Sequence, residues 1–155
     1  MGSANTAGNS GVEVRLAGED DADQLSAMNY EFNGEKISTK YIVDALHTSH
    51  EIVAIASLDD GVAGFACGQL YRSFCYDSLC GEITEMYVRE AYRRKGVGSA
   101  LLLFLEKVLR KRGAESIKVL TGQDNGAALG LYASLGYLKE GEVVLGKQLR
   151  LLEYH

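Results

Sequence analysis

The chain has 155 residues, the usual length of one domain, and its 46% hydrophobic and 24% charged residues exclude a wholly disordered protein. The formal net charge of −5 argues against a general nucleic-acid binder, and no apolar stretch approaches the ~20 residues of a membrane span. Three cysteines without metal-ligand spacing, and a polar start without a secretory pattern, favour a cytoplasmic protein with reduced thiols. We therefore expect no nucleic acid, membrane or metal as a partner.

The first half of the chain alternates strand and helix patterns. Residues 1–11 are low in complexity and predict a disordered leader, so residues 12–155 are predicted to form the single domain. Apolar periodicity and turn residues then predict the following elements in order: a strand over 12–16, a helix over 19–32, a helix capped by Ser38, a hairpin of strands 52–58 and 62–71, and a strand over 82–88.

The second half is dominated by one long helix. Apolar residues recur with the helical period over 97–112, and Gly113 supplies the stop. A short strand over 117–120 and a helix over 125–135 follow, and Val143, Val144, Leu145 and Leu149 predict one or two closing strands. This order of elements indicates a mixed α/β fold.

A basic, glycine-rich segment lies between strand 82–88 and the long helix. The first N–H groups of a helix lack partners and can bind an anion, while glycine lets a phosphate approach the backbone. The spacing fits neither the Walker loop nor the dinucleotide fingerprint. The segment predicts a pyrophosphate cradle, with a simple tight turn as the alternative, and consists of Arg93, Arg94, Lys95, Gly96, Val97, Gly98 and Ser99.

Residues 81–98 (GEITEMYVREAYRRKGVG) resemble the central motif of the GCN5-related N-acetyltransferase (GNAT) family. In that motif a strand ending in Val precedes Arg/Gln-x-x-Gly-x-Gly/Ala at a helix start, and Arg93, Gly96 and Gly98 occupy its defining positions. Downstream, the spacing of Asn125, Ala128, Tyr132 and Gly136 is similar to the second motif of the family, so the resemblance covers residues 12 to about 149.

The resemblance implies both a fold and an activity. The fold would be a mixed, mostly antiparallel sheet of about six to seven strands, flanked by helices and splayed between the fourth and fifth strands. The activity would be transfer of an acetyl group from acetyl-CoA, without a metal, to a primary amine of a small aminoglycoside-like or polyamine-like molecule. Acetylation of protein N-termini or lysines, and a non-catalytic acyl-CoA binding module, are the alternatives. The oligomeric state is left open, with a homodimer as one alternative.

The same resemblance assigns roles to the acetyl-CoA site. The backbone of Met86, Tyr87 and Val88 would pair with the pantetheine arm of the coenzyme. The segment 93–99 would hold the pyrophosphate, and Asn125 would contact the pantetheine. Tyr132 would lie near the sulfur atom.

Transfer to an amine requires a base and an acid. A lysine-like amine has a pKa of ~10.4 and must lose a proton, for which Glu82 and Glu85 are the candidate bases. Strand alternation points these two to opposite faces unless a bulge re-aims one, and a solvated strand residue is the alternative for each. A phenol at ~10 can protonate a departing thiolate, which fits Tyr132 as the acid; a core aromatic is the alternative.

Overall fold

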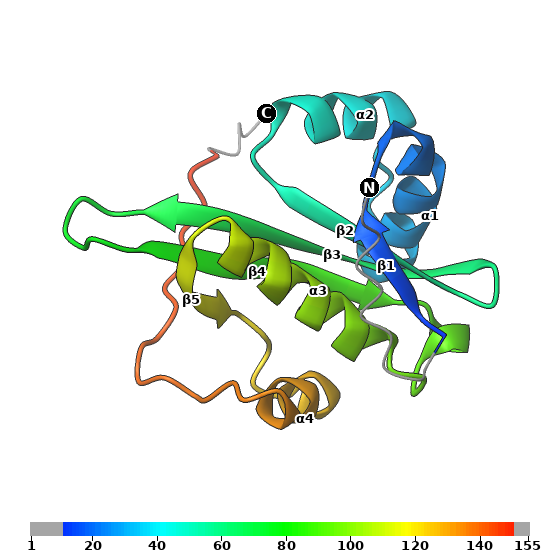
Figure 1. Ribbon diagram of the computed structural model, residues 1–155. Coiled ribbons are helices and arrows are strands. Elements are labelled where there is room, and N and C mark those ends of the chain that lie inside the picture. Colours follow the sequence, from blue (N-terminus) through cyan, green and yellow to red (C-terminus); the bar gives the residue numbers. More distant parts are fainter. Residues whose placement is uncertain (1–10, 151–155) are drawn as a thin grey trace, which may run out of the picture.

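The structure, a computed structural model, describes residues 11–150 (Figure 1). The predicted leader therefore lies, except for Gly11, outside the described residues. One sheet of five strands runs in the order β1-β2-β3-β4-β5; neighbours are antiparallel except β4 and β5, which are parallel. The strands are β1 (Glu13–Leu16), β2 (Ile52–Leu58), β3 (Gly61–Arg72), β4 (Leu79–Val88) and β5 (Ala114–Val119).

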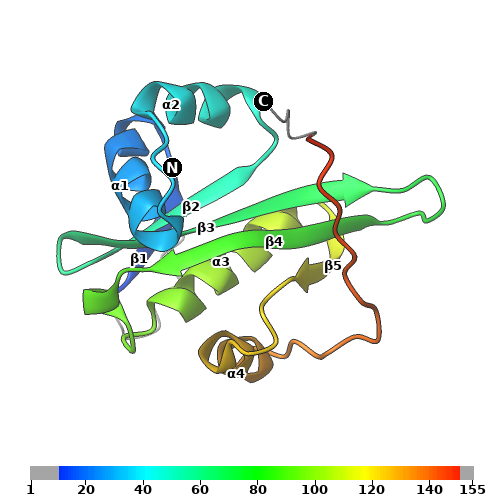
Figure 2. The ribbon, with the colours of Figure 1, turned by 180° about the vertical axis from the view of Figure 1, so that it is seen from behind.

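Helices cover both faces of this sheet. Figures 1 and 2 show α3 across one face, α1 and α2 on the opposite face, and α4 beyond β5. The predicted cap of the second helix is confirmed, because the hydroxyl of Ser38 accepts the N–H of Tyr41 at 3.1 Å. The helices are α1 (Ala22–Asn33), α2 (Thr39–Thr48), α3 (Val97–Lys111) and α4 (Gly126–Ser134), with short 3-10 turns at Glu19–Asp21 and Glu90–Tyr92.

The face under α3 holds the larger core. Small side chains on β2 and β3 let the helix approach the sheet closely, since Ala54, Ala56, Ala63 and Ala66 are fully buried. The apolar stripe of α3 fills the space above them, with Leu101, Leu102, Leu105 and Leu109 at most 1% exposed. The opposite face has a smaller core of Leu25, Met28, Ile55, Phe65 and Cys67.

The hairpin between β2 and β3 forms as predicted. Asp59 and Asp60 have positive φ angles of 52° and 62°, the conformation of a type I′ turn, whose twist suits antiparallel strands. Gly61 then begins β3. A Cβ atom there would overlap the hydroxyl of Tyr92, so a larger residue would have to displace the Tyr92 side chain.

The mixed α/β, mostly antiparallel fold is confirmed, with fewer strands than expected. The predicted closing strands are wrong, because residues 137–150 form neither helix nor strand. After Tyr137, the large apolar side chains of this segment are exposed, from 70% for Val144 to 90% for Leu145. Alternating apolar residues make a strand only where a partner edge supplies hydrogen bonds, and among the described residues this segment pairs with none. Across residues 11–150 no helix is long and apolar enough to cross a bilayer.

Two glycine substitutions should shift stability in opposite directions. Gly64→Ala would place a Cβ atom 2.5 Å from the carbonyl oxygen of Tyr87 in β4, so we expect the free energy of unfolding to fall by about 1–3 kcal/mol. Gly130→Ala lies in exposed α4 with nothing within 4 Å, and should raise it by up to ~1 kcal/mol. Urea unfolding of both variants checks the pair; equal effects would contradict the packing of β3 on β4.

Candidate active site

Strand β4 outruns its partner β5. The parallel pairing ends at Ile83 opposite Val119, while β4 continues to Val88 paired only with β3. From Thr84 to Val88, β4 therefore has a free edge within the described structure. The chain after β5 turns away toward α4, and Figure 1 shows the two strands diverging. This gap lies between the fourth and fifth strands, as predicted.

The backbone groups that point into this gap follow from the phase of the β3–β4 ladder. Arg89 donates its N–H to the carbonyl of Ala63 at 2.8 Å, so alternate residues of β4 bond to β3. Met86 and Val88 consequently direct their N–H and carbonyl groups into the gap, and Tyr87 directs its own toward β3. The carbonyl of Val88 also accepts the Nε of Arg93 at 3.0 Å.

A β-bulge re-aims the two candidate carboxylates. Cys67 lies opposite Glu85 and Gly68 opposite Ile83, which leaves Thr84 as the extra residue of β4. Glu82 lies opposite Gln69, two residues from Cys67 on β3. Residues two apart on a strand share a face, so both glutamates lie on the α1–α2 face and not on opposite faces.

The two glutamates nevertheless differ in their surroundings. Glu85 is exposed, and its negative charge repels that of Glu51, which lies just before β2. Burial raises the pKa of the Cys67 thiol, and the charges of Glu51 and Glu85 raise it further. Glu82 is half-buried and accepts a hydrogen bond from the Nε2 of Gln69 at 3.2 Å. At the bulge between them, the buried Oγ1 of Thr84 has no hydrogen-bond partner among the described residues.

The predicted pyrophosphate cradle opens α3 beside the gap. Gly96 adopts a φ of +81° and Ala100 donates the first helical bond to its carbonyl at 3.0 Å. The N–H groups of Val97, Gly98 and Ser99 precede that bond and have no acceptor in the helix. A Cβ atom on Gly98 would lie 3.1 Å from Leu131 of α4 and about 4 Å from the side chains of Val88 and Met86. The start of α3, the end of β4 and α4 therefore meet.

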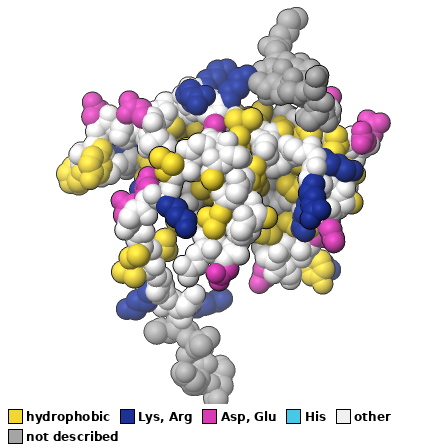
Figure 3. All heavy atoms as spheres, turned by 90° about the horizontal axis from the view of Figure 1, so that it is seen from below, with side chains coloured by type: hydrophobic (Ala, Val, Ile, Leu, Met, Phe, Trp, Pro, Cys, Tyr) yellow, Lys and Arg dark blue, Asp and Glu magenta, His cyan; other side chains and the backbone are white. Residues whose placement is uncertain are grey.

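Basic side chains surround this helix start. The Arg93 guanidinium lies 5.9 Å from the ring centre of Tyr87, and the Lys95 ammonium lies 6.0 Å from that of Tyr92. Arg94 is exposed and has a φ of +62°. Seen from below, Figure 3 shows Lys and Arg in small groups among acidic and apolar side chains, so the acidic chain still presents local positive charge.

Helix α4 brings the remaining predicted residues to the gap. The side chain of Asn125 caps the helix by accepting the N–H of Ala128 at 3.1 Å. Tyr132 is 7% exposed, belongs to the core under α3 and packs with its ring centre 5.6 Å from that of Tyr137. Burial raises the pKa of Tyr132, and its hydroxyl has no hydrogen-bond partner within residues 11–150.

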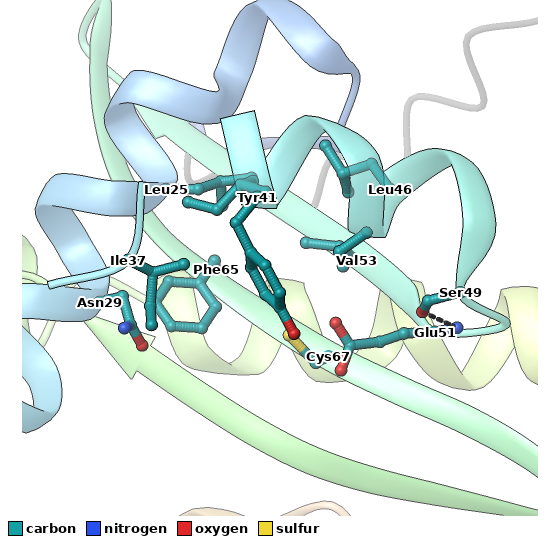
Figure 4. Close-up of a pocket in the computed structure, with 12 residues that line it drawn as sticks. Leu25, Asn29, Ile37, Tyr41, Leu46, Ser49, Glu51, Val53, Phe65 and Cys67 are labelled. Atoms are coloured by element: carbon teal, nitrogen blue, oxygen red, sulfur yellow. Dashed lines mark hydrogen bonds between the residues drawn. The ribbon is translucent and has the colours of Figure 1, made fainter. Parts of the chain in front are cut away.

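A cavity of about 190 Å³ lies on the α1–α2 face of the sheet, between these two helices and strands β2 and β3 (Figure 4). Glu51, at its rim, was missed by the sequence reasoning, because a carboxylate one residue before a buried strand carries no motif. Burial, with a smaller contribution from Glu85, raises the pKa of Glu51. Glu31 of α1 pairs with Arg89 at 3.1 Å and does not line this cavity. Among residues 11–150, no three His, Cys, Asp or Glu side chains could hold a metal together.

Comparison with known proteins decides the family. The family model described as the acetyltransferase (GNAT) family matches residues 20–137, most of the chain and all of the gap, cradle and α4. The chain belongs to the GNAT family. A curated acetyltransferase of Yersinia pestis (strain Pestoides F) is 30% identical to this GNAT protein over 104 residues, 67% of this chain and 70% of its own. Acetyltransferase YE1169 of Yersinia enterocolitica is 29% identical over the same shares.

Solved structures show the same fold as this GNAT protein at lower identity. An aminoglycoside acetyltransferase from an uncultured soil metagenomic sample, crystallised with trehalose, has a TM-score of 0.79 and 17% identity, covering 92% of this chain and 99% of its own. The ribosomal-protein-alanine N-acetyltransferase of Brucella melitensis biovar Abortus 2308 has a TM-score of 0.75 and 16% identity, with 88% and 99% covered. GNAT membership makes the chain an acetyltransferase, and these distant structures add the fold alone.

Proposed function

We propose that this acetyltransferase moves the acetyl group of acetyl-CoA to a primary amine of a small cationic molecule, as in aminoglycosides or polyamines. One observation carries the proposal: the free edge of β4 leads directly to the unpaired N–H groups at the start of α3. An extended pantetheine arm can add to a strand edge, and its pyrophosphate then reaches a helix N-terminus. Coenzyme A has this length and order of groups.

Three groups of residues around the gap bind different parts of acetyl-CoA. The N–H and carbonyl groups of Met86 and Val88 bind the pantetheine arm. Tyr87 lies between them in the strand and directs its own backbone groups toward β3. The segment 93–99 binds the pyrophosphate through backbone N–H groups and the charges of Arg93, Arg94 and Lys95. Asn125, which caps α4, contacts the arm from the far side of the gap.

In the reaction, the neutral amine attacks the thioester carbonyl and the carbon–sulfur bond breaks. An ammonium and acetyl-CoA give an amide, coenzyme A thiol and one proton. Glu85 or Glu82 receives the amine proton, directly or through water, because both carboxylates lie on the α1–α2 face of β4. Tyr132 protonates the departing sulfur. Its raised pKa keeps the phenol protonated at neutral pH and makes it a weaker acid than free tyrosine.

Two features support a cationic acceptor. Glu85 and Glu51 form no ion pair with a basic side chain among the described residues, so their charge is left for a ligand. Fold neighbours include aminoglycoside acetyltransferases, one of them crystallised with sisomicin. The free thiols of Cys67, Cys75 and Cys80 support a cytoplasmic location as part of the same proposal.

The proposal is tested by following free thiol release from acetyl-CoA with a panel of aminoglycosides, polyamines and peptides. We expect at least one small amine to accelerate thiol release and to appear as its acetamide by mass spectrometry. Acetylation of peptides alone would establish protein acetylation in its place. Tight coenzyme A binding without release for any amine would identify a non-catalytic module.

Gly98→Asp should weaken coenzyme A binding at least tenfold, about 1.4 kcal/mol, because it adds negative charge where the pyrophosphate approaches. Gly98→Ala is the matched control, since it adds the same Cβ atom, 3.1 Å from Leu131, without charge. Calorimetric titration of coenzyme A into both variants measures the difference. Equal affinity in the two variants would refute the cradle.

Glu85→Gln should lower turnover by about 10²- to 10⁴-fold if Glu85 is the base, because the amide cannot accept the proton. Glu82→Gln is the paired variant on the same face, and it should have the smaller effect because Gln69 already binds its carboxylate. Steady-state rates across pH measure both. Wild-type rates and pH profiles in both variants would show that neither carboxylate is the base.

Tyr132→Phe should lower turnover by about 10- to 10³-fold and leave coenzyme A affinity nearly unchanged. The hydroxyl has no partner in the described structure, so the thermal midpoint should change little. Steady-state kinetics together with thermal unfolding separate the acid from a core aromatic. Full turnover in Tyr132→Phe would refute the acid role and assign Tyr132 to packing alone.

A further inference from the structure

The cavity between α1, α2 and the sheet has two chemically different parts. Most of its wall is aliphatic or aromatic, and Figure 4 shows these side chains projecting inward from both helices and from β2 and β3. Its other part is a polar end near the start of β2. The apolar wall is formed by Leu25, Ile37, Ile42, Leu46, Val53 and Phe65.

The polar end gathers three groups from different elements. Figure 4 shows the carboxylate of Glu51, the hydroxyl of Tyr41 and the sulfur of Cys67 lying toward one another. Cys67 is 7% exposed, and its thiol interacts with the carboxylate of Glu51. Ser49 holds the segment in place by accepting the N–H of Glu51 at 2.9 Å. A buried polar atom therefore faces this end of the cavity beside a carboxylate.

The polar end lies on the same face of the sheet as Glu85, one of the two proposed bases. Glu51 precedes β2, Cys67 lies on β3, and Glu85 lies opposite Cys67 on β4. Since adjacent strands are about 4.8 Å apart, the backbones of β2 and β4 are roughly 10 Å apart, and the two carboxylates approach each other over Cys67. The far edge of β4 is the free edge at the gap. An ammonium between Glu51 and Glu85 is therefore one strand away from that edge.

Charge and size together restrict the ligand. The ion pairs in residues 11–150 are Arg15–Asp21, His47–Glu19 and Arg89–Glu31, so the charge at the polar end is not neutralised by the protein. An apolar cavity of about 150 Å³ binds benzene, and this one is about 190 Å³, enough for one ring or a short alkyl chain. A second ammonium placed along the apolar wall would lose its hydration without a partner.

We infer that the acceptor is an amine with one ammonium group on a compact aliphatic or aromatic body, which packs into this half-open cavity while Glu51 binds the ammonium. This inference rests on the proposed transfer to a small cationic amine, and it replaces the aminoglycoside or polyamine acceptor with a monoamine. It separates such monoamines from aminoglycosides and polyamines, which carry several cations and little apolar surface. Glu51 is then a specificity-determining residue, distinct from the base on β4.

The test compares amines that differ in the number of cations and in the presence of an apolar body, at a saturating concentration of acetyl-CoA. Hexylamine and phenethylamine carry one cation and an apolar body, ethanolamine has the cation without the body, and spermidine and kanamycin carry several cations. We expect kcat/KM for hexylamine or phenethylamine to exceed that for each of the other three at least tenfold. A preference for spermidine or kanamycin would overturn the inference and leave the proposed function standing.

Two variants locate the selectivity in this cavity. Glu51→Gln should raise KM for hexylamine at least tenfold, with kcat and KM for acetyl-CoA nearly unchanged. Ala45→Phe fills the cavity from α2 and should abolish the preference for hexylamine over ethanolamine, whereas Ala27→Phe, on the exposed side of α1, should retain it. Unchanged selectivity in Ala45→Phe, with the fold intact by circular dichroism, would overturn the inference.

Direct binding separates the two possible failures. If no amine is acetylated, the proposed function fails, and calorimetric titration of hexylamine and ethanolamine still decides the cavity. Tighter binding of hexylamine that is lost in Glu51→Gln would support the inference. Equal affinity for the two amines would overturn it.

Discussion

Strand β4 has hydrogen-bonding neighbours on both sides over its first half and on one side over its second, and the site depends on this change. A strand edge is a row of unpaired donors and acceptors, which most proteins protect from other chains. Here the edge is short, it begins at a bulge, and it ends where α3 starts. The ladder that leaves the backbone of Met86 and Val88 without a strand partner at this edge also places the side chain of Glu85 on the α1–α2 face of the sheet.

The position of the cradle depends in turn on how α3 packs. Four fully buried alanines on β2 and β3 draw this helix close to the sheet, and its leucines fix its rotation. The helix start is then fixed beside the end of β4, with Gly98 against Leu131 of α4. Positive φ angles at Arg94 and Gly96 make the sharp entry to the helix, and Arg94 adopts a conformation that L side chains rarely take.

The sequence predicted those parts of the structure that local patterns determine. Helical periodicity located α3, the cap at Ser38 located α2, and two motifs located the gap and α4. The face of Glu85 could not be predicted, because one inserted residue reverses strand alternation and no local preference marks Thr84. Glu51 also escaped detection, since its significance comes from α2 and β3 packing around it. The prediction of closing strands is wrong because residues 143–149 have a strand-like local pattern but find no partner edge among the described residues.

The outer edge of β5 has a consequence for the dynamics of the sheet. β5 bonds to β4 through one short parallel ladder, whereas β3 is bonded to β2 and β4 on its two sides over its central residues 64–68. Amide hydrogens of β5 should therefore exchange with solvent through small local openings, and those of β3 only through disruption of the sheet. The wall of the gap formed by β5 is then its compliant side and β4 its rigid side. The long, narrow donor that we propose would then enter by displacing the compliant wall, while β4 stays in place.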